Sequence, residues 1–390
     1  MDSAELDPYD HGFQWDPYPY YRRLREQDPV YFNRQRGFWL LTKWADVHQA
    51  FRDFKTFASA GAVALEADAV DKFPYPMFIS TDPPDHSRVR RLFAPLFTPE
   101  KMKVLEDYTR RRTREFLKPH LSSGRLDFVG DLAARIPMDV LAVLLKIPAT
   151  DQDNVRGWAD DLIAREDKQH DVSPRNVAGY MGLAAYFEQH VATHLSMSMD
   201  GSLLGALIRA ETEAVMSHAE VIGALILFAI AGNETTTKTM GNLALRLWQH
   251  PEQRRWLVDD PSLIPQAVEE LLRFDGSSQI IVRIVAQDIE MRGKQLKKGQ
   301  RVGLCIVSAG RDEEKFPNAE TFDIRRGSRE HMAFGHGTHA CLGAALARLE
   351  IRVGFEEILR LMPDYQIEES GLQLAHNPNV RGYSRLPIQF

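Results

Sequence analysis

Phe334-Gly-His-Gly-Thr-His-Ala-Cys341-Leu-Gly-Ala-Ala-Leu-Ala-Arg-Leu-Glu350 joins a glycine-rich loop to an apolar helical pattern and places one cysteine at the junction. Gly335 and Gly337 permit turns and close backbone approaches that other residues resist. Backbone N–H groups at the start of the following helix can hydrogen-bond a sulfur atom and favour its anionic form. Cys341 is therefore a candidate metal thiolate.

Other interpretations also fit this stretch taken alone. Cys341 could be a buried free cysteine packed among apolar neighbours, which is the usual fate of a lone cysteine. It could also be a nucleophile activated by a histidine. A zinc site is a further alternative, although the spacing matches no familiar zinc pattern; its ligands would be His331, His336, His339 and Cys341.

The stretch resembles the haem-binding loop of the cytochrome P450 family, in which Phe-Gly, two residues, a small residue, His or Arg, one residue, and Cys-x-Gly follow one another. The matching residues are Phe334, Gly335, His339, Cys341 and Gly343, and Thr338 lies between Gly337 and His339. The resemblance implies that Cys341 ligates the iron of haem b (iron protoporphyrin IX) and that His339 contacts a haem propionate. It then removes the ligand role from His331 and His336.

A second stretch begins with Ser217-His-Ala-Glu220, a capping box that predicts the start of a long helix. The run Val221–Ile230 is apolar nearly all round, so this helix should be buried. An acid and several hydroxyls then interrupt it at residues 231–237. Buried polar groups are costly and need a reason; one is a helix kink in which Gly232 and back-bonded threonines bend the backbone.

The interruption also resembles the oxygen-activation motif of the same family, with Ala231, Gly232, Glu234 and Thr235 at the matching positions. The resemblance implies that Thr235 stabilises activated oxygen and that Glu234 relays protons to it. A positioned acid and hydroxyl can hold and pass protons through ordered water.

Three further cations are candidate cofactor anchors. His86 and Arg90 follow a Pro-Pro turn and lie four residues apart on one predicted helical face. Arg283 projects from an apolar strand pattern. Taken alone, the first two could form a solvated basic face and the third could extend its head to solvent. The family resemblance implies that all three bind haem propionates together with His339.

Glu270 and Arg273 lie at i,i+3 on a predicted helix. Such a pair is commonly a surface contact worth only about 0.2–0.5 kcal/mol. Glu, two residues and Arg at this place also resemble the family's structural pair, which is completed by a downstream basic residue, here Arg326. The family usually has Asn before the following Arg-Asp, and Gly310 departs from that pattern.

Composition limits the class of protein. The 390 residues are 44% hydrophobic and 26% charged, as in an ordinary globular protein. A net charge of −6 argues against general nucleic-acid binding. The chain has two cysteines, Cys305 and Cys341, which fits a reducing compartment. Cys305 lies in an apolar run and is expected to be a small buried residue.

Location is predicted from the amino terminus and the longest apolar run. Residues 1–10 lack the basic and apolar regions of a signal peptide. Val221–Ala231 is shorter than the ~20 residues that span a bilayer. We therefore expect a cytoplasmic protein of the soluble bacterial type, without a membrane.

The motifs at residues 86, 235, 273 and 341 would all have to meet one cofactor. We therefore expect a single domain over residues 1–390, mainly α with small β-sheets, which encloses haem between a long central helix and the cysteine loop. The segment 56–79 shows no sustained period and is expected to be an irregular loop near the substrate. By the resemblance, the substrate pocket includes Ile230, Ala231, Ile280 and Ile281.

The resemblance implies a haem-dependent monooxygenase that uses O2 to hydroxylate or otherwise oxidise a largely apolar small organic substrate. Two cysteines are too few for an iron–sulfur cluster beside the haem ligand. Electrons should therefore come from an external ferredoxin and ferredoxin reductase, docking near Arg88, Arg91 and residues 110–114. Rival functions are a peroxide-driven oxygenase and a non-catalytic haem protein.

Overall fold

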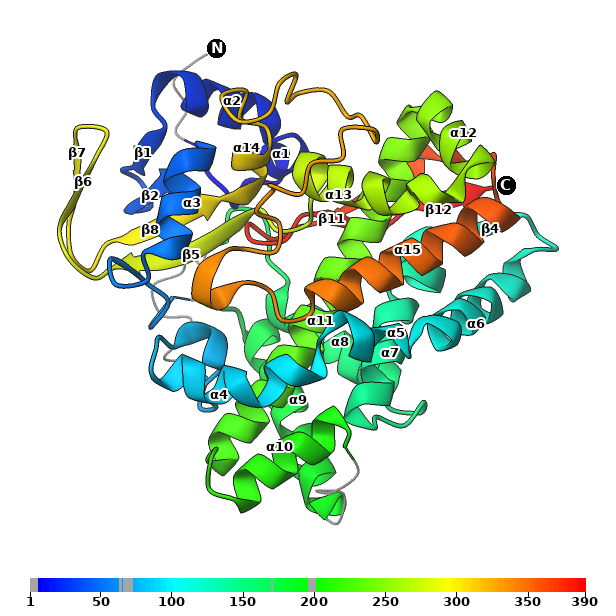
Figure 1. Cartoon of the computed structure of the whole chain (residues 1–390), viewed down its shortest axis with the longest axis horizontal. Coiled ribbons are helices and arrows are strands. Elements are labelled where there is room, and N and C mark those ends of the chain that lie inside the picture. Colours follow the sequence, from blue (N-terminus) through cyan, green and yellow to red (C-terminus); the bar gives the residue numbers. More distant parts are fainter. Residues whose placement is uncertain (1–5, 63–64, 66–72, 170, 196–200) are drawn as a thin grey trace.

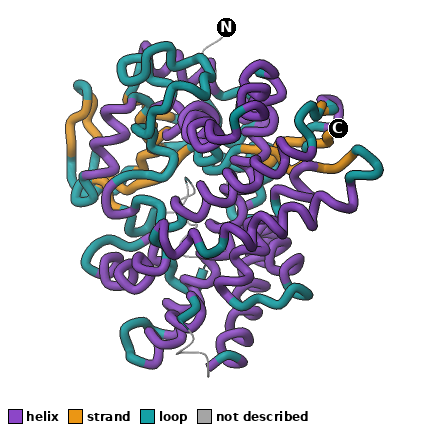
Figure 2. The backbone as a smooth tube through the Cα atoms, turned by 45° about the vertical axis from the view of Figure 1, so that its right-hand side comes forward, coloured by secondary structure: helices purple, strands orange, loops and turns teal. Residues whose placement is uncertain are grey.

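Helices make up most of the protein, and the strands form small sheets (Figures 1 and 2). The structure is a computed structural model that describes residues 6–62, 65, 73–169, 171–195 and 201–390. The predicted class, mainly α with small β-sheets, is confirmed. The assignment of residues 1–390 to a single domain stays a prediction.

The helices differ widely in length, from single turns to one helix of 32 residues. The α-helices are α1 (His11–Trp15), α2 (Tyr18–Gln27), α3 (Trp44–Arg52), α4 (Asp85–Phe93), α5 (Pro99–Lys103), α6 (Glu106–Leu117), α7 (Arg135–Leu145), α8 (Gln152–Ile163), α9 (Pro174–Thr193), α10 (Leu203–Thr212), α11 (His218–Gln249), α12 (Pro251–Asp259), α13 (Ile264–Asp275), α14 (Ile306–Gly310) and α15 (Ala344–Leu361). Short 3₁₀ or π turns are η1 (Phe78–Ser80), η2 (Ala94–Leu96), η3 (Lys118–His120), η4 (Phe128–Ala133), η6 (Pro261–Leu263), η7 (Gly337–His339) and η8 (Glu369–Gly371).

The largest sheet has the order β1-β2-β8-β5-β3, and β2 and β8 are its parallel pair. Its strands are β1 (Val30–Asn33), β2 (Phe38–Leu41), β3 (Phe57–Ala58), β5 (Ile280–Val285) and β8 (Arg301–Cys305). Arg283 pairs with Val302 in the register of this sheet. The smaller sheets are formed by β4 (Arg125–Asp127), β9 (Gln366–Ile367) and β12 (Pro387–Gln389), by β6 (Ile289–Met291) and β7 (Lys294–Leu296), and by β10 (Gln373–Ala375) and β11 (Gly382–Arg385).

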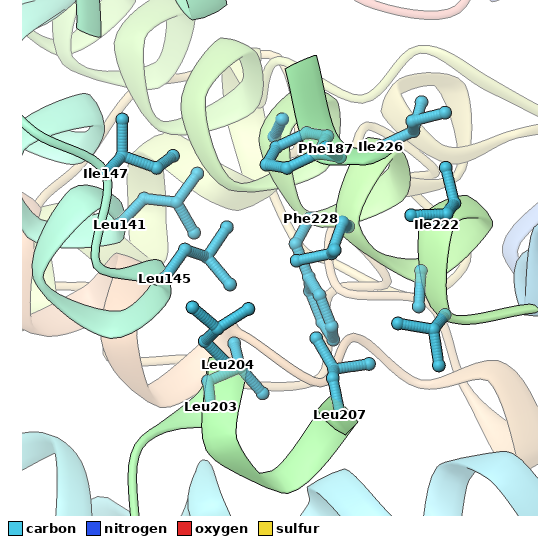
Figure 3. Close-up of a cluster of buried hydrophobic side chains, with 14 of the residues drawn as sticks. Leu141, Leu145, Ile147, Phe187, Leu203, Leu204, Leu207, Ile222, Ile226 and Phe228 are labelled. Carbon is cyan, nitrogen blue, oxygen red and sulfur yellow. The ribbon is translucent and has the colours of Figure 1, made fainter. Parts of the chain in front are cut away.

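Helix α11 is the central element, and other helices surround it (Figure 1). The predicted capping box is present: the Ser217 side chain accepts from the Glu220 N–H, and the Glu220 side chain accepts from the Ser217 N–H. The apolar half of α11 packs against α7, α9 and α10 (Figure 3). This burial explains why nearly every side of the helix is apolar.

The polar stretch at residues 231–237 does not end α11, which continues to Gln249. Thr235 Oγ1 donates a back-bond to the Ala231 carbonyl at 3.0 Å. The continuous helix is long and apolar enough to cross a membrane by length and composition, which the shorter apolar run did not suggest. However, 67% of the most apolar 18-residue stretch of this helix is buried inside the protein, as in a core helix.

The segment predicted as irregular contains the two-residue strand β3 at its start and the turn η1 near its end. Residues 63–64 and 66–72 of this segment lie outside the described residues. The part at Pro76 packs tightly on α11, because a Cβ added at Gly223 would lie 2.2 Å from the Pro76 carbonyl oxygen. Glycine at this position allows the segment to contact the central helix directly.

Candidate functional site

The cysteine loop depends on two glycines with positive φ. Gly335 has φ +66° and Gly337 has φ +72°, a region that side chains disfavour. A Cβ at Gly337 would also lie 2.6 Å from the Phe51 carbonyl oxygen of α3. The Cys341 N–H donates to the Phe334 carbonyl at 2.7 Å, closing the loop. The glycines thus let the loop turn against α3 and present Cys341 just before α15.

Cys341 has accessible surface, although burial raises the pKa of its thiol. Both observations fit a side chain that lines an enclosed space. The Gly343 N–H and the guanidinium groups of Arg90 and Arg348 oppose that rise in pKa. The predicted support of the anion by the start of α15 is therefore present but smaller than the cost of burial. A bound metal cation would supply the positive charge that a thiolate needs here.

The histidines of the loop point to different partners. His331 Nε2 lies 3.0 Å from Glu269 Oε2 in a buried pair. His336 is exposed and lies beside the ring of His48. Within the described ranges, no group of three or more His, Cys, Asp or Glu side chains is arranged to hold a metal ion. The zinc alternative is therefore wrong for the described part of the chain.

Four cationic or ionisable side chains from separate elements meet beside the cysteine loop: His86 and Arg90 of α4, Arg283 of β5, and His339. The rings of His86 and His339 have centroids 3.9 Å apart. Arg90 Nη2 donates to the Ala340 carbonyl at 2.5 Å. Four buried polar atoms here have no hydrogen-bond partner among the described residues: His86 Nδ1, His86 Nε2, Thr338 Oγ1 and His339 Nε2.

The electrostatics of this cluster suit an anion. Burial, with His86, Arg283 and Arg90 nearby, lowers the pKa of His339 to about 3. Burial also lowers the pKa of Arg283 to about 10, while Asp82 acts in the opposite direction. Buried cations and orphaned donors are costly unless an anion pairs with them. Two carboxylates would satisfy them, so these residues fit the propionates of haem.

We expect Arg283→Ala to speed the loss of haem from the holoprotein by about 10- to 100-fold, because a hydrogen bond to a charged group is worth about 1.5–3 kcal/mol. The measurement is the rate of haem transfer to an excess of an apoprotein acceptor. Arg255→Ala is the control, because Arg255 pairs with Asp259 on the exposed side of α12. Equal transfer rates in the two variants would contradict the propionate role.

The predicted oxygen-activation residues share one face of α11. Ala231 is exposed, although residues 221–229 before it are all buried, so open space lies beside it. Glu234, Thr235 and Lys238 follow at i+3, i+4 and i+7 on the same side. Lys238 Nζ lies 3.4 Å from Glu234 Oε2 in a buried pair. The role of Lys238 was missed, although its i,i+4 spacing from Glu234 was visible in the sequence.

The two predicted pocket residues on β5, Ile280 and Ile281, face opposite sides of the strand. Arg283 lies with its guanidinium 5.7 Å from the ring of Phe51, and Ile281 packs in the same hydrophobic cluster as that ring. Ile280 is fully buried in the cluster formed by the amino-terminal segment. Alternate residues of a strand face opposite sides. The structure therefore places Ile280 away from the cofactor anchors, and Ile281 on their side.

The three residues of the predicted structural group lie in contact. Arg273 Nη2 and Nε donate to the two carboxylate oxygens of Glu270 at 2.7 and 2.8 Å. Arg326 Nε lies 3.2 Å from Glu270 Oε2. Arg273 Nη1 also donates to the carbonyls of Gly310 and Ala319. This group joins α13 to the chain that leads into the cysteine loop.

Comparison with known proteins agrees with these motifs. The family model described as Cytochrome P450 matches residues 258–362. The chain is 38% identical over 387 residues to the putative cytochrome P450 123 of Mycobacterium tuberculosis, covering 98% of this chain and 96% of that protein. The chain belongs to the cytochrome P450 family. It is also 35% identical to the vitamin D(3) 25-hydroxylase of Pseudonocardia autotrophica, over 99% of this chain and 96% of that one.

Solved structures of cytochromes P450 share the whole fold. CYP109E1 from Bacillus megaterium, in complex with testosterone, aligns with a TM-score of 0.88 at 29% identity over 97% of this chain and 98% of that one. Epothilone D-bound cytochrome P450epoK aligns with a TM-score of 0.90 at 28% identity over 99% of both chains. This cytochrome P450 is thus an oxidoreductase, a monooxygenase whose family uses a haem–thiolate cofactor, O2, electron-transfer partners and small-molecule substrates.

Proposed function

We propose that this enzyme uses haem b, whose iron the Cys341 thiolate would hold, to hydroxylate or otherwise oxidise a largely apolar small organic substrate. The observation that carries the proposal is the group of buried or half-buried cationic or ionisable side chains beside Cys341, whose unpaired polar atoms suit carboxylates. A non-catalytic haem protein would need these anchors as well. The acid and hydroxyl on α11 favour an oxygenase over that alternative.

The protein's residues act by holding and shielding. His86, Arg90, Arg283 and His339 would bind the cofactor carboxylates. When bound, the haem–thiolate group supplies O2 activation and hydrogen abstraction from the substrate. Thr235 Oγ1 and Glu234 would hold and pass protons on the α11 side. Ile230, Ala231 and Ile281 would exclude water and contact the substrate.

The substrate class is inferred from apolar lining and from relatives. Ile230 belongs to the apolar surroundings of the large cluster that also contains Phe228 and Phe78. Pockets of this kind bind apolar ligands with few polar contacts. The names of two relatives include vitamin D(3) and testosterone. We therefore propose a multi-ring or similarly apolar substrate, with testosterone as the first probe.

The proposed ferredoxin surface is smaller than the sequence suggested. Arg88 pairs with Glu220, and the arginines at 110, 112 and 114 are bound in ion pairs to Glu357, Glu356 and Asp139. These charges hold helices together and are not free for a partner. Arg91 of α4 is exposed beside Arg90, and the Cα of Arg52 lies 3.5 Å from the Cβ position of Gly337. We place ferredoxin docking at Arg52 and Arg91, next to the cysteine loop.

We expect testosterone or a related apolar compound to shift the haem spin state and to give an O2-dependent product when ferredoxin and its reductase supply electrons. The double variant Arg52→Glu/Arg91→Glu should slow reduction by ferredoxin at low salt by about 10-fold or more, because opposite charges speed encounter. Reduction by dithionite should not change. Arg111→Glu, on the exposed side of α6, is the control.

Two results would contradict this function. Turnover that proceeds with peroxide and is not increased by ferredoxin would show that the enzyme is a peroxide-driven oxygenase. If the tested compounds changed the haem spectrum but none gave an O2-dependent product, the protein would be a non-catalytic haem protein.

A further inference from the structure

Four charged or titratable side chains form a ladder between α8 and α11, two helices in contact. Arg156 and Asp160 lie at i,i+4 on α8, and Glu234 and Lys238 lie at i,i+4 on α11. Residues at this spacing share a helical face. The acid of the oxygen-activation motif is therefore tied to a second helix that carries no family motif.

Helices α8 and α11 are in contact, and they bring the side chains of Asp160 and Glu234 within hydrogen-bonding reach of each other. Asp160 Oδ1 is inaccessible to solvent and receives no hydrogen bond from a donor in the described ranges of the chain. Two ionised carboxylates in contact would repel each other, so one proton must lie between them. The Asp160–Glu234 pair can thus hold one proton between α8 and α11.

The neighbouring charges decide which carboxyl holds the proton. Burial and Glu234 raise the pKa of Asp160 to about 8, against the opposing effect of Lys238 and Arg156. Burial alone would raise the pKa of Glu234, but the Lys238 ammonium and the Asp160 hydrogen bond bring it below its ordinary value. Because Lys238 Nζ lies 3.4 Å from Glu234 Oε2, the negative charge is favoured on Glu234 and the proton on Asp160, which makes Asp160 the donor and Glu234 the acceptor.

The exposed fractions of the two acids indicate which of them can take up a proton from solvent. Glu234 is only 4% exposed, whereas Asp160 is partly exposed and Arg156 beside it reaches solvent. A proton from water can therefore reach Asp160 more easily than Glu234. Thr235 is the next residue of α11 after Glu234, about 100° further round the helix.

We propose that Asp160 is the residue through which protons from solvent enter the site, passing them to Glu234, and that Lys238 keeps Glu234 ready to accept. In each transfer the Asp160 O–H bond breaks and a Glu234 O–H bond forms. Glu234 then gives up this proton on the Thr235 side and is ionised again, and Asp160 regains a proton from water at the surface, so both acids return to their starting state.

This inference rests on the proposed function, in which Glu234 supplies protons to the α11 side. The two can fail separately. Loss of the thiolate-type spectrum on removal of Cys341 tests the cofactor site, whereas the protonation of Asp160 is measured without any turnover.

The first test is infrared spectroscopy of the substrate-free holoprotein. We expect the carbonyl stretch of a protonated carboxyl group that is present at pH 7 and disappears with a midpoint near pH 8. Asp160→Asn should remove this band. Asp161→Asn should keep it, because the neighbouring Asp161 pairs with Arg175 on the exposed side of α8. A band that persists in Asp160→Asn overturns the proposal.

The second test is kinetic, with testosterone as the substrate probe. Asp160→Asn should lower the product formed per electron by on the order of 100-fold, at unchanged testosterone affinity, since a positioned proton donor contributes about that factor. In the wild type this yield should fall as pH rises through about 8, because Asp160 then loses its proton. Asp160→Glu should restore both the yield and its pH dependence. An Asp160→Asn enzyme with wild-type yield and pH profile overturns the proposal.

Discussion

Replacing Cys341 with Ser is expected to abolish the thiolate-type spectrum of the reduced carbon monoxide complex, together with monooxygenase activity. The serine hydroxyl has nearly the same size as the thiol but does not ionise at neutral pH, so it cannot donate the electron density of a thiolate. The loop itself should persist. Its glycines and the hydrogen bond from the Cys341 N–H to the Phe334 carbonyl do not involve the sulfur atom.

Cys305 offers a matched control. It is fully buried in β8, and burial raises the pKa of its thiol to about 12. It behaves as a small core residue, as its apolar sequence context predicted. Cys305→Ala should therefore keep the thiolate-type spectrum. A Cys341→Ser protein that also kept this spectrum would overturn the assignment of the axial ligand.

The site residues that could be predicted were those with fixed local spacing. The order Phe334, Gly335, His339 and Cys341 is a property of one loop, and the structure shows why: both positive-φ glycines are needed for it to turn against α3. The anchors proposed at residues 86, 90 and 283 came from the family resemblance. Their meeting point was visible only once α4, β5 and the loop were placed together.

The sequence does not show which charges are neutralised by distant partners, and this limited what could be predicted. The arginines at 110 and 114 looked like a free basic run, but Glu357 of α15, 2% exposed, pairs with both. Asp160 was missed for the same reason, because its partner Glu234 lies on another helix. Ile280 faces the side of β5 opposite to Arg283, and strand parity could have predicted this from the sequence.

Gly310 shows how a departure from the family pattern can be structural. A Cβ at this position would lie 2.1 Å from the Arg273 carbonyl oxygen. The Gly310 carbonyl in turn accepts a hydrogen bond from Arg273 Nη1 at 2.6 Å. Glycine here lets α14 approach α13 closely, so the structural group and this glycine form one unit.

That unit should be highly sensitive to the loss of one charge. We expect Glu270→Gln to lower the free energy of unfolding by about 3–5 kcal/mol, because it leaves the Arg273 guanidinium, whose side chain is 0% exposed, without its carboxylate. The measurement is urea unfolding of the holoprotein at pH 7, compared with Glu26→Gln. Glu26 also pairs with an arginine, but on the exposed side of α2, so its loss should change stability little. If both variants unfolded at the same urea concentration, the group around Glu270 would have no special structural role, and the contact would be no more than an ordinary i,i+3 pair.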